Sequence, residues 1–208
     1  MKKLLLLIIV LPIIVFSQEV QIIDSNDVIE KDGLLLLKST STLITGTIKY
    51  WYENMQLKEE VIIKDGKLDG ISKKWYENGQ LSYEVTYNNG IANGVIKKWY
   101  ENGQLKREQT NRDGKIDGFD KEWYENGQLS FEGTYKEGKA EGDLIEWYEN
   151  GKLKSKGTLK NDKKEGLVGW WYDNGQLKEQ GIYKNNIKEG LTEWWHENGQ
   201  LKEQATYL

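Results

Sequence analysis

Short segments of this chain alternate apolar and polar residues with a period of two. In residues 81–87, apolar or aromatic Leu81, Tyr83, Val85 and Tyr87 are separated by single polar residues. Such alternation places the two sets on opposite faces of a β-strand. A glycine or an Asn-Gly pair also interrupts the chain about every ten residues, which disfavours helix. The sequence therefore predicts an all-β protein.

The strand pattern belongs to a repeat of 24 residues in seven copies. A tryptophan recurs without insertion at Trp51, Trp75, Trp99, Trp123, Trp147, Trp171 and Trp195. A glycine lies five residues before each tryptophan, and a leucine lies six residues after it. A fixed period of this kind is typical of proteins built from stacked units that contact only their neighbours.

An Asn-Gly pair lies between two β-rich runs in six of the copies, and this pair is the strongest short signal for a β-hairpin. We expect a two-residue turn with positive φ at both positions, which Asn tolerates and Gly adopts freely. This turn would place Tyr76 opposite Leu81 and Trp75 opposite Ser82. The predicted repeat-turn residues are Asn78, Gly79, Asn102, Gly103, Asn126, Gly127, Asn150, Gly151, Asn174, Gly175, Asn198 and Gly199.

The same register brings oppositely charged residues together across the strands. The expected pairs are Lys49 with Glu60, Lys73 with Glu84, Lys97 with Glu108 and Lys121 with Glu132. Segments such as Lys-Asp-Gly-Lys at residues 64–67 predict a second tight turn between copies. The chain should therefore form an elongated antiparallel meander of about fourteen strands, roughly 65 Å long at about 4.8 Å per strand.

The N-terminal 45 residues lack the tryptophan motif and divide into two segments. Lys2 and Lys3 precede a short apolar run at residues 4–16, which is typical of a signal peptide cleaved after Ser17; an uncleaved anchor or a buried strand are the alternatives. We therefore expect an exported protein, periplasmic, on the outer surface or secreted. Residues 18–45 should form an N-terminal capping segment with a hairpin around residues 32–33, and residues 46–208 the seven-repeat array.

The composition limits the classes of partner. The chain has 208 residues, 38% of them hydrophobic and 30% charged, which suits a folded protein with a modest core. Its net charge is −4, from 29 basic and 33 acidic residues that are well mixed. Without a continuous basic stripe, nucleic acid and anionic membranes are poor partners, and we expect no integral membrane span after signal removal.

The side chains needed for catalysis are scarce. The sequence contains no cysteine and one histidine, His196, which occupies a position that is tyrosine in the other copies. Zinc sites and Cys/His nucleophile pairs are therefore not expected. Aspartates such as Asp65 and Asp113 stand next to glycines, but their spacing fits turns better than calcium loops. We predict a protein that is not an enzyme, with no catalytic residues, no metal site and no cofactor.

Aromatic residues are the remaining candidates for binding. The seven phased tryptophans should form a column about 10 Å apart, on the face that carries Lys, Glu and Thr. Each ring could lie across its neighbours, covering lysine stems and the apolar residue four positions before it, such as Ile71. The rings could instead present a stacking surface to a ligand. The candidate binding residues are Trp75, Trp99, Trp123, Trp147, Trp171, Lys106 and Lys154.

The unit G-x-x-x-x-W-Y-E-N-G-Q-L-K, as in residues 94–106, resembles the MORN-type repeats. Within these it is similar to the bacterial variant often labelled YwqK-family antitoxin, over residues 46–207. The resemblance implies a β-hairpin array used as a scaffold for protein or membrane-surface contacts, and the antitoxin label implies neutralisation of a partner toxin. That label also suggests a cytosolic protein, whereas residues 1–17 indicate export. The chain departs from the pattern at Met55, Lys152, Asp162, Asn186 and His196.

These observations favour an exported, non-enzymatic scaffold that mediates protein-protein interaction. One alternative is an antitoxin or immunity protein that neutralises a toxin, and another is a cell-wall glycan or choline binding module. We expect the partner to be another protein. A further alternative is self-association through the C-terminal edge strand, since Lys202, Glu203 and Gln204 are its visible protection against edge pairing.

Overall fold

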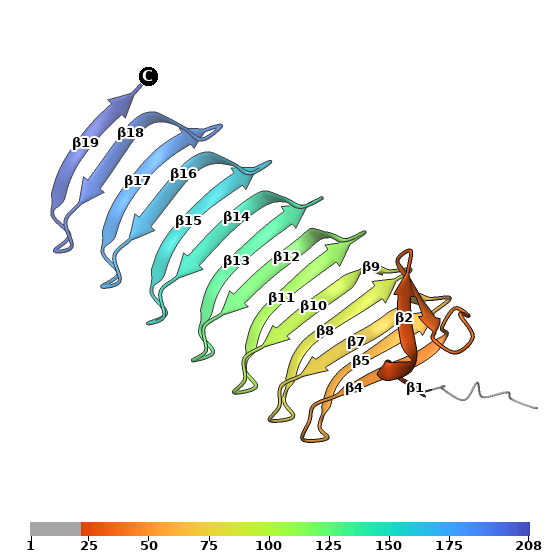
Figure 1. The fold of residues 1–208 in the computed structure, drawn as a ribbon. Helices are drawn as coiled ribbons and strands as arrows, with labels where there is room; N and C mark the ends of the chain where they lie inside the picture. Colours follow the sequence, from red (N-terminus) through yellow and green to blue (C-terminus); the bar gives the residue numbers. More distant parts are fainter. Residues whose placement is uncertain (1–21) are drawn as a thin grey trace, which may run out of the picture.

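A computed structural model describes residues 22–208, and it shows one long twisted sheet with a small cap at one end (Figure 1). The predicted signal peptide, residues 1–17, lies outside the described residues. The array strands are β4 (Gly46–Trp51), β5 (Leu57–Lys64), β6 (Lys67–Leu68), β7 (Gly70–Trp75), β8 (Leu81–Asn88), β9 (Ile91–Ala92), β10 (Gly94–Trp99), β11 (Leu105–Arg112), β12 (Lys115–Trp123), β13 (Leu129–Lys136), β14 (Lys139–Trp147), β15 (Leu153–Lys160), β16 (Lys163–Trp171), β17 (Leu177–Lys184), β18 (Ile187–Trp195) and β19 (Leu201–Tyr207).

These strands pair in chain order as an antiparallel meander. Because β6 and β7, and likewise β9 and β10, are two parts of one strand interrupted by a single residue, the sixteen segments form the fourteen strands that the sequence predicts. The predicted all-β repeat architecture is confirmed.

The cross-strand register also follows the prediction. Gly70 pairs with Tyr87, and all four expected Lys-Glu pairs form, with N–O distances of 2.9–3.3 Å. The charged groups of these pairs are partly open to solvent, so each contributes at most about 1 kcal/mol to stability. Their repetition fixes the register because slipping by one residue would move each charge to the other face.

The Asn-Gly hairpins close differently from the prediction. In the second copy the Tyr76 amide donates to the Gln80 carbonyl at 2.8 Å, and the Gly79 amide donates to the Tyr76 carbonyl at 2.9 Å. The loop therefore has three residues, of which only Gly79 has a positive φ, 84°. The Asn78 side chain favours this form, since its Oδ1 accepts the Gln80 amide at 2.9 Å.

The longer loop shifts the register at the end of each hairpin. Trp75 pairs with Leu81 rather than Ser82, and Tyr76 does not face Leu81, so these two expected pairings are wrong. The two-residue turn with positive φ at both positions occurs instead between the copies. Asp65 and Gly66 adopt φ values of 50° and 76° there. The second tight turn is therefore confirmed.

In the second to seventh copies, the glycine five residues before the tryptophan lies where the pairing with the preceding strand is interrupted by a bulge. In the fourth copy the β11–β12 pairing skips across Gly118, whose φ is 130°. A Cβ at this position would lie 2.9 Å from the Cβ of Thr110. Backbone conformation and close approach therefore both require glycine here.

The segment before the array packs on the first hairpin. β1 (Ile22–Asp24) pairs parallel with β4, and a short 3-10 helix, η1 (Ser25–Asp27), follows it. β2 (Val28–Lys31) and β3 (Leu34–Leu37) form the hairpin that the sequence predicts around residues 32–33. The cluster of buried apolar side chains at this end comprises Ile23, Ile44, Ile48, Val61 and Ile63.

Replacing Gly127 with Val should destabilise the fourth hairpin by about 1–3 kcal/mol, because a β-branched residue at positive φ is strained. Gly127 has φ 84°, and a Cβ there would collide with the Gln104 side chain of the preceding copy. Hydrogen exchange should show protection lost around residues 119–135 and retained in distant copies. The Gly127→Asn variant is the control, since Asn tolerates this conformation better. Unchanged protection in Gly127→Val would contradict the turn assignment.

Candidate functional site

The two faces of the sheet differ in character. The first, here called the tryptophan face, carries the side chains two and four positions before each tryptophan, including the Lys-Glu pairs. Trp171 packs on this face, because a Cβ at Gly169 would lie 2.6 Å from its Cη2 atom. The opposite face carries the side chains one and three positions before each tryptophan. It contains three hollows and is here called the hollowed face.

The tryptophans are half-buried parts of the sheet surface. The exception is Trp51, which is 57% exposed; the candidates Trp75, Trp99, Trp123, Trp147 and Trp171 are all partly covered. Of the residues four positions before them, Ile71 is 45% and Leu167 62% exposed, whereas Phe119 is partly buried. Trp171 lies over position 169, two before it, and Leu167 stays largely exposed, so in that copy the ring does not cover the apolar residue four positions before it. The pairing of β16 with β17 shifts register between Trp170 and Trp171, so that Trp171 pairs with Leu177.

Hydrogen bonds between successive copies explain the Trp-Tyr and Asn-Gly pairs that recur in six of the seven copies. Each tyrosine hydroxyl donates to the carbonyl of the next tryptophan at 2.7–2.9 Å, in Tyr52–Trp75, Tyr76–Trp99, Tyr100–Trp123, Tyr124–Trp147, Tyr148–Trp171 and Tyr172–Trp195. The turn asparagine adds a bond from its Nδ2 to the next turn, as from Asn78 to the Glu101 carbonyl at 2.8 Å. Each bond contributes about 1 kcal/mol. The turn residues therefore join neighbouring copies.

The hollowed face lacks such uniformity. The residues immediately before the tryptophans are Tyr50, Lys74, Lys98, Glu122, Glu146, Trp170 and Trp194. The residues three positions before them are Ile48, Ser72, Ile96, Asp120, Leu144, Val168 and Thr192. Several of these are buried, and some lie over glycines of the preceding strand. Val168, for example, lies over Gly157, where a Cβ would be 2.9 Å from its methyl groups.

Three hollows follow one another along this face, at Tyr100, Tyr124 and Tyr148. Their volumes are about 330, 350 and 240 Å³. Each lies between the tyrosine of one copy and the side chain before the next tryptophan. Lys106 and Trp123 both line the first, and Lys154 and Trp171 both line the third, although the ring of Trp171 packs on the opposite, tryptophan face. Lys106 lies over the Tyr100 ring, 5.1 Å from its centroid.

The middle hollow contains an ion pair with two hydrogen bonds. Arg107 binds Asp120 through two hydrogen bonds of 2.8 and 2.6 Å, and it lies 3.3 Å from Glu122. The Asp120 side chain is almost completely buried, whereas that of Arg107 is about one quarter exposed. The hydrogen bond to Asp120 raises the pKa of Arg107. Burial raises the pKa of Tyr135, which lines the same hollow, and the charge of Asp120 adds to this effect.

A family model described as MORN repeat variant matches residues 68–89, 92–110, 121–137, 140–161, 164–185 and 188–208, more than half of the chain. The chain belongs to this family. MORN repeats are generally protein-interaction or binding modules. No curated protein shows significant similarity to the chain. The first copy, around Trp51, lies outside the matches but forms the same hairpin, with Trp51 paired to Leu57.

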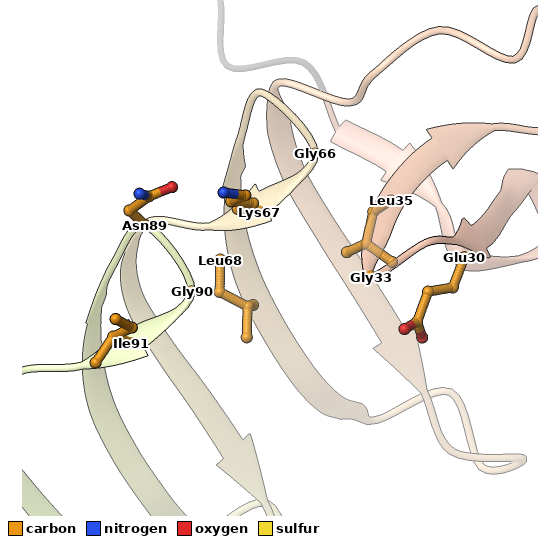
Figure 2. A pocket seen from close by; sticks show the side chains of 9 residues that line it. All are labelled: Glu30, Gly33, Leu35, Gly66, Lys67, Leu68, Asn89, Gly90 and Ile91. Carbon is orange, nitrogen blue, oxygen red and sulfur yellow. The ribbon is translucent and has the colours of Figure 1, made fainter. Parts of the chain in front are cut away.

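The MORN array ends in a groove where it meets the cap (Figure 2). Leu35 of the cap and Leu68 and Ile91 of the array line this groove of about 380 Å³, with Glu30 and Lys67 among its polar residues. The Leu35 amide donates to the Gly66 carbonyl at 2.8 Å, which fixes the cap against the turn. Among residues 22–208, no helix is long and apolar enough to span a membrane, and no group of three or more acidic, His or Cys residues could hold a metal.

Sequence reasoning missed the Arg107–Asp120 pair and the hollows of the MORN array. Arg107 is the one arginine at its position of the repeat, and Asp120 is the one aspartate at its position. Comparing the copies column by column would have found both as departures from the repeat. Their contact could not be inferred, because Arg107 pairs directly with Glu122 in the strand register and reaches Asp120 diagonally.

Proposed function

We propose that the chain is an exported, non-enzymatic scaffold that binds a partner protein through its hollowed face. The observation that supports this most strongly is the contrast between the uniform framework and the variable residues of this face. Copies that share the turns, tryptophans and tyrosine hydrogen bonds differ most in the column immediately before the tryptophan, on the hollowed face, which includes Tyr50, Lys98 and Trp170, whereas the column two positions before it, on the tryptophan face, is Lys in four of the seven copies. A surface that only stabilises the sheet has no need of such differences.

The chemistry of this face suits a protein partner. Tyrosine, tryptophan and arginine, which predominate in binding hot spots, gather around the hollows at Arg107, Tyr124, Tyr135 and Trp170. The charged groups are mixed in sign, which supplies specificity rather than general attraction. A flat array of several hollows also offers more contact area than a single small-molecule pocket.

A matched pair of charge reversals tests the proposed face. Glu146→Lys changes the hollowed face and Glu132→Lys changes the tryptophan face; both glutamates lie about equally exposed in salt bridges with lysine. The parent and both variants should be used to capture partners from the extracellular fraction of the native organism. We expect Glu146→Lys to lose the partner and Glu132→Lys to retain it. The reverse result would contradict the proposal.

Export is supported by Lys2, Lys3 and the apolar run that follows them. We expect the mature chain to begin at Gln18 and to be recovered outside the cytoplasm. N-terminal sequencing of the fractionated protein measures both. A cytosolic chain beginning at Met1 would contradict export and would favour the antitoxin role implied by the YwqK-family resemblance.

The other proposed roles have distinct outcomes. An antitoxin or immunity protein would bind one toxin tightly in a one-to-one complex, and a toxin gene would lie beside its own. A cell-wall glycan or choline binding module would be retained on the corresponding resin, and substitution of the tryptophans would abolish retention. Self-association through β19 would give a concentration-dependent dimer in sedimentation, because β19 pairs only with β18 within the described residues.

A further inference from the structure

Near the C-terminal end of the array, lysines of the chain itself lie over aromatic rings of the hollowed face. The Lys164 Nζ atom is 4.6 Å from the ring centroid of Trp170 and 5.2 Å from that of Tyr183. In the next copy the Lys188 Nζ atom is 4.6 Å from the centroid of Trp194. At such distances the negative face of the ring attracts the cation.

Lys188 shows how this arrangement is completed by a carboxylate. Glu179 accepts a hydrogen bond from its Nζ at 2.8 Å. Burial lowers the pKa of Lys188, but the hydrogen bond to Glu179 together with the charges of Glu179, Tyr183 and Tyr207 outweighs this, so its pKa is raised overall. An ammonium group held between aromatic rings and a carboxylate is therefore a stable arrangement on this face.

Two copies earlier, the corresponding positions carry no charge. Ile116 stands where Lys164 does, and Ala140 stands where Lys188 does. Tyr135, the equivalent of Tyr183, pairs with Ala140 across the strands. In the described part of the chain, no lysine or arginine makes a cation contact with the rings of Tyr124, Phe131 or Tyr135.

These three aromatic residues line the middle hollow of about 350 Å³. Glu122 and Glu146 also line it, on the strands on either side of Phe131, with which both are paired. The hollow therefore combines aromatic rings and carboxylates, the same kinds of group that surround Lys188. Its own chain supplies no lysine from position 140.

The charges in this hollow are also unbalanced. Asp120, Glu122 and Glu146 supply three negative charges, whereas Arg107 and Lys154 supply two positive ones, a difference of one negative charge. Arg107 is held by Asp120 and Glu122 together. Lys154 lies 3.4 Å from Glu146, and about half of its side chain is exposed. One additional cation would balance the site.

We propose that the middle hollow binds a lysine or arginine side chain of the partner protein. The cationic group lies against the rings of Phe131 and Tyr135 and between the carboxylates of Glu122 and Glu146. The ligand is thereby held by the same kinds of group as Lys188, with ring and carboxylate exchanged, because Phe131 stands where Glu179 does and Glu146 stands where Trp194 does. This inference rests on the proposed protein-binding function and names the part of the partner that the hollow recognises.

The probe that tests the site is an acetylated and amidated Gly-Lys-Gly-Lys-Gly peptide, titrated into the full chain and followed by NMR. We expect shifts concentrated on the amides of β12, β13 and β14. The matched control peptide carries Nε-acetyl groups on both lysines, which removes the charge and keeps the length. Equal shifts with both peptides would overturn the proposal.

Two variants locate the binding. Glu122→Gln combined with Glu146→Gln keeps the shape of the hollow and should weaken peptide binding about tenfold or more. The control variant makes the same exchange at two exposed turn glutamates, Glu53 and Glu77, and should bind like the parent. Unchanged binding by the Glu122/Glu146 variant would contradict the site.

Ala140→Lys adds the side chain that the later copies already have, so this lysine should fill the hollow and block the peptide. Ala140 is almost fully buried, so Ala140→Lys could fail to fold. The Glu122/Glu146 glutamine variant then still tests the site.

Partner capture separates the scaffold function from the cation site. If the partner binds parent and glutamine variant alike, this inference fails and the scaffold function stands. If the peptide binds as expected but no partner is captured, the scaffold function fails and the cation site stands.

Discussion

Replacing Arg107 with Ala should lower the free energy of unfolding of the central copies by about 3 kcal/mol. The substitution leaves Asp120, whose side chain is 3% exposed, as a buried carboxylate without its cation. Removing one member of a buried pair costs about 3–5 kcal/mol, and the partial exposure of Arg107 places the effect at the lower end. Hydrogen exchange of the backbone amides in β11, β12 and β13 measures this loss locally.

Arg112→Ala is the matched control, since Arg112 lies on the same strand but is exposed. This variant should change stability by no more than about 0.5 kcal/mol. If the amides of β11 to β13 exchange at the same rates in Arg107→Ala and Arg112→Ala, Asp120 is not a buried charge that depends on Arg107. The stability of the middle hollow would then require another explanation.

Replacing Trp123 with Ala should destabilise its copy by about 3 kcal/mol. The ring is partly buried on the sheet, and the Trp123 carbonyl is held by the Tyr100 hydroxyl at 2.8 Å. Removing the ring exposes the surrounding surface and loosens the hydrogen bond between copies. Local exchange and thermal melting measure the effect.

Trp51→Ala provides the comparison because Trp51 is 57% exposed. We expect it to cost about 1 kcal/mol or less. If Trp99→Ala, Trp123→Ala and Trp147→Ala all melt like the parent, the tryptophans are not structural. A folded triple variant that still binds the partner would exclude them as contact residues.

The sequence predicted the features of the sheet that depend on the repeat. The period of 24 residues and the alternation of residues such as Tyr83 and Val85 fix the strands, and the Lys73–Glu84 type of pair fixes their register. These features depend on local patterns that recur in each copy. Because the same pattern recurs in seven copies, the strand assignment of each copy is supported by the others.

The sequence did not predict details that depend on side-chain hydrogen bonding. Asn78 was expected to adopt positive φ, but its side chain accepts the Gln80 amide and stabilises a three-residue loop. The bonds from Tyr76 to Trp99 and from Asn78 to Glu101 join atoms 23 residues apart. The repeat suggests that successive copies are neighbours, yet it does not show which donor reaches which carbonyl.

The candidate site was predicted in part. Lys106 and Lys154 do lie beside hollows, each with one of the predicted tryptophans. The sequence reasoning sought binding residues where the copies agree, whereas the hollowed face is formed where they differ. Glu122, Phe131 and Glu146 become neighbours only once the strand pairing is known.

Photo-crosslinking from the two faces of one copy tests directly whether the hollowed face is the contact surface. Benzoylphenylalanine can replace Phe131, which is paired with Glu122 on the hollowed face, or Phe119, four positions before Trp123 on the tryptophan face. Both exchanges replace phenylalanine by a larger aromatic residue. In the extracellular fraction of the native organism, we expect a crosslinked partner from position 131 and none from position 119. A partner crosslinked from position 119 alone would contradict the account.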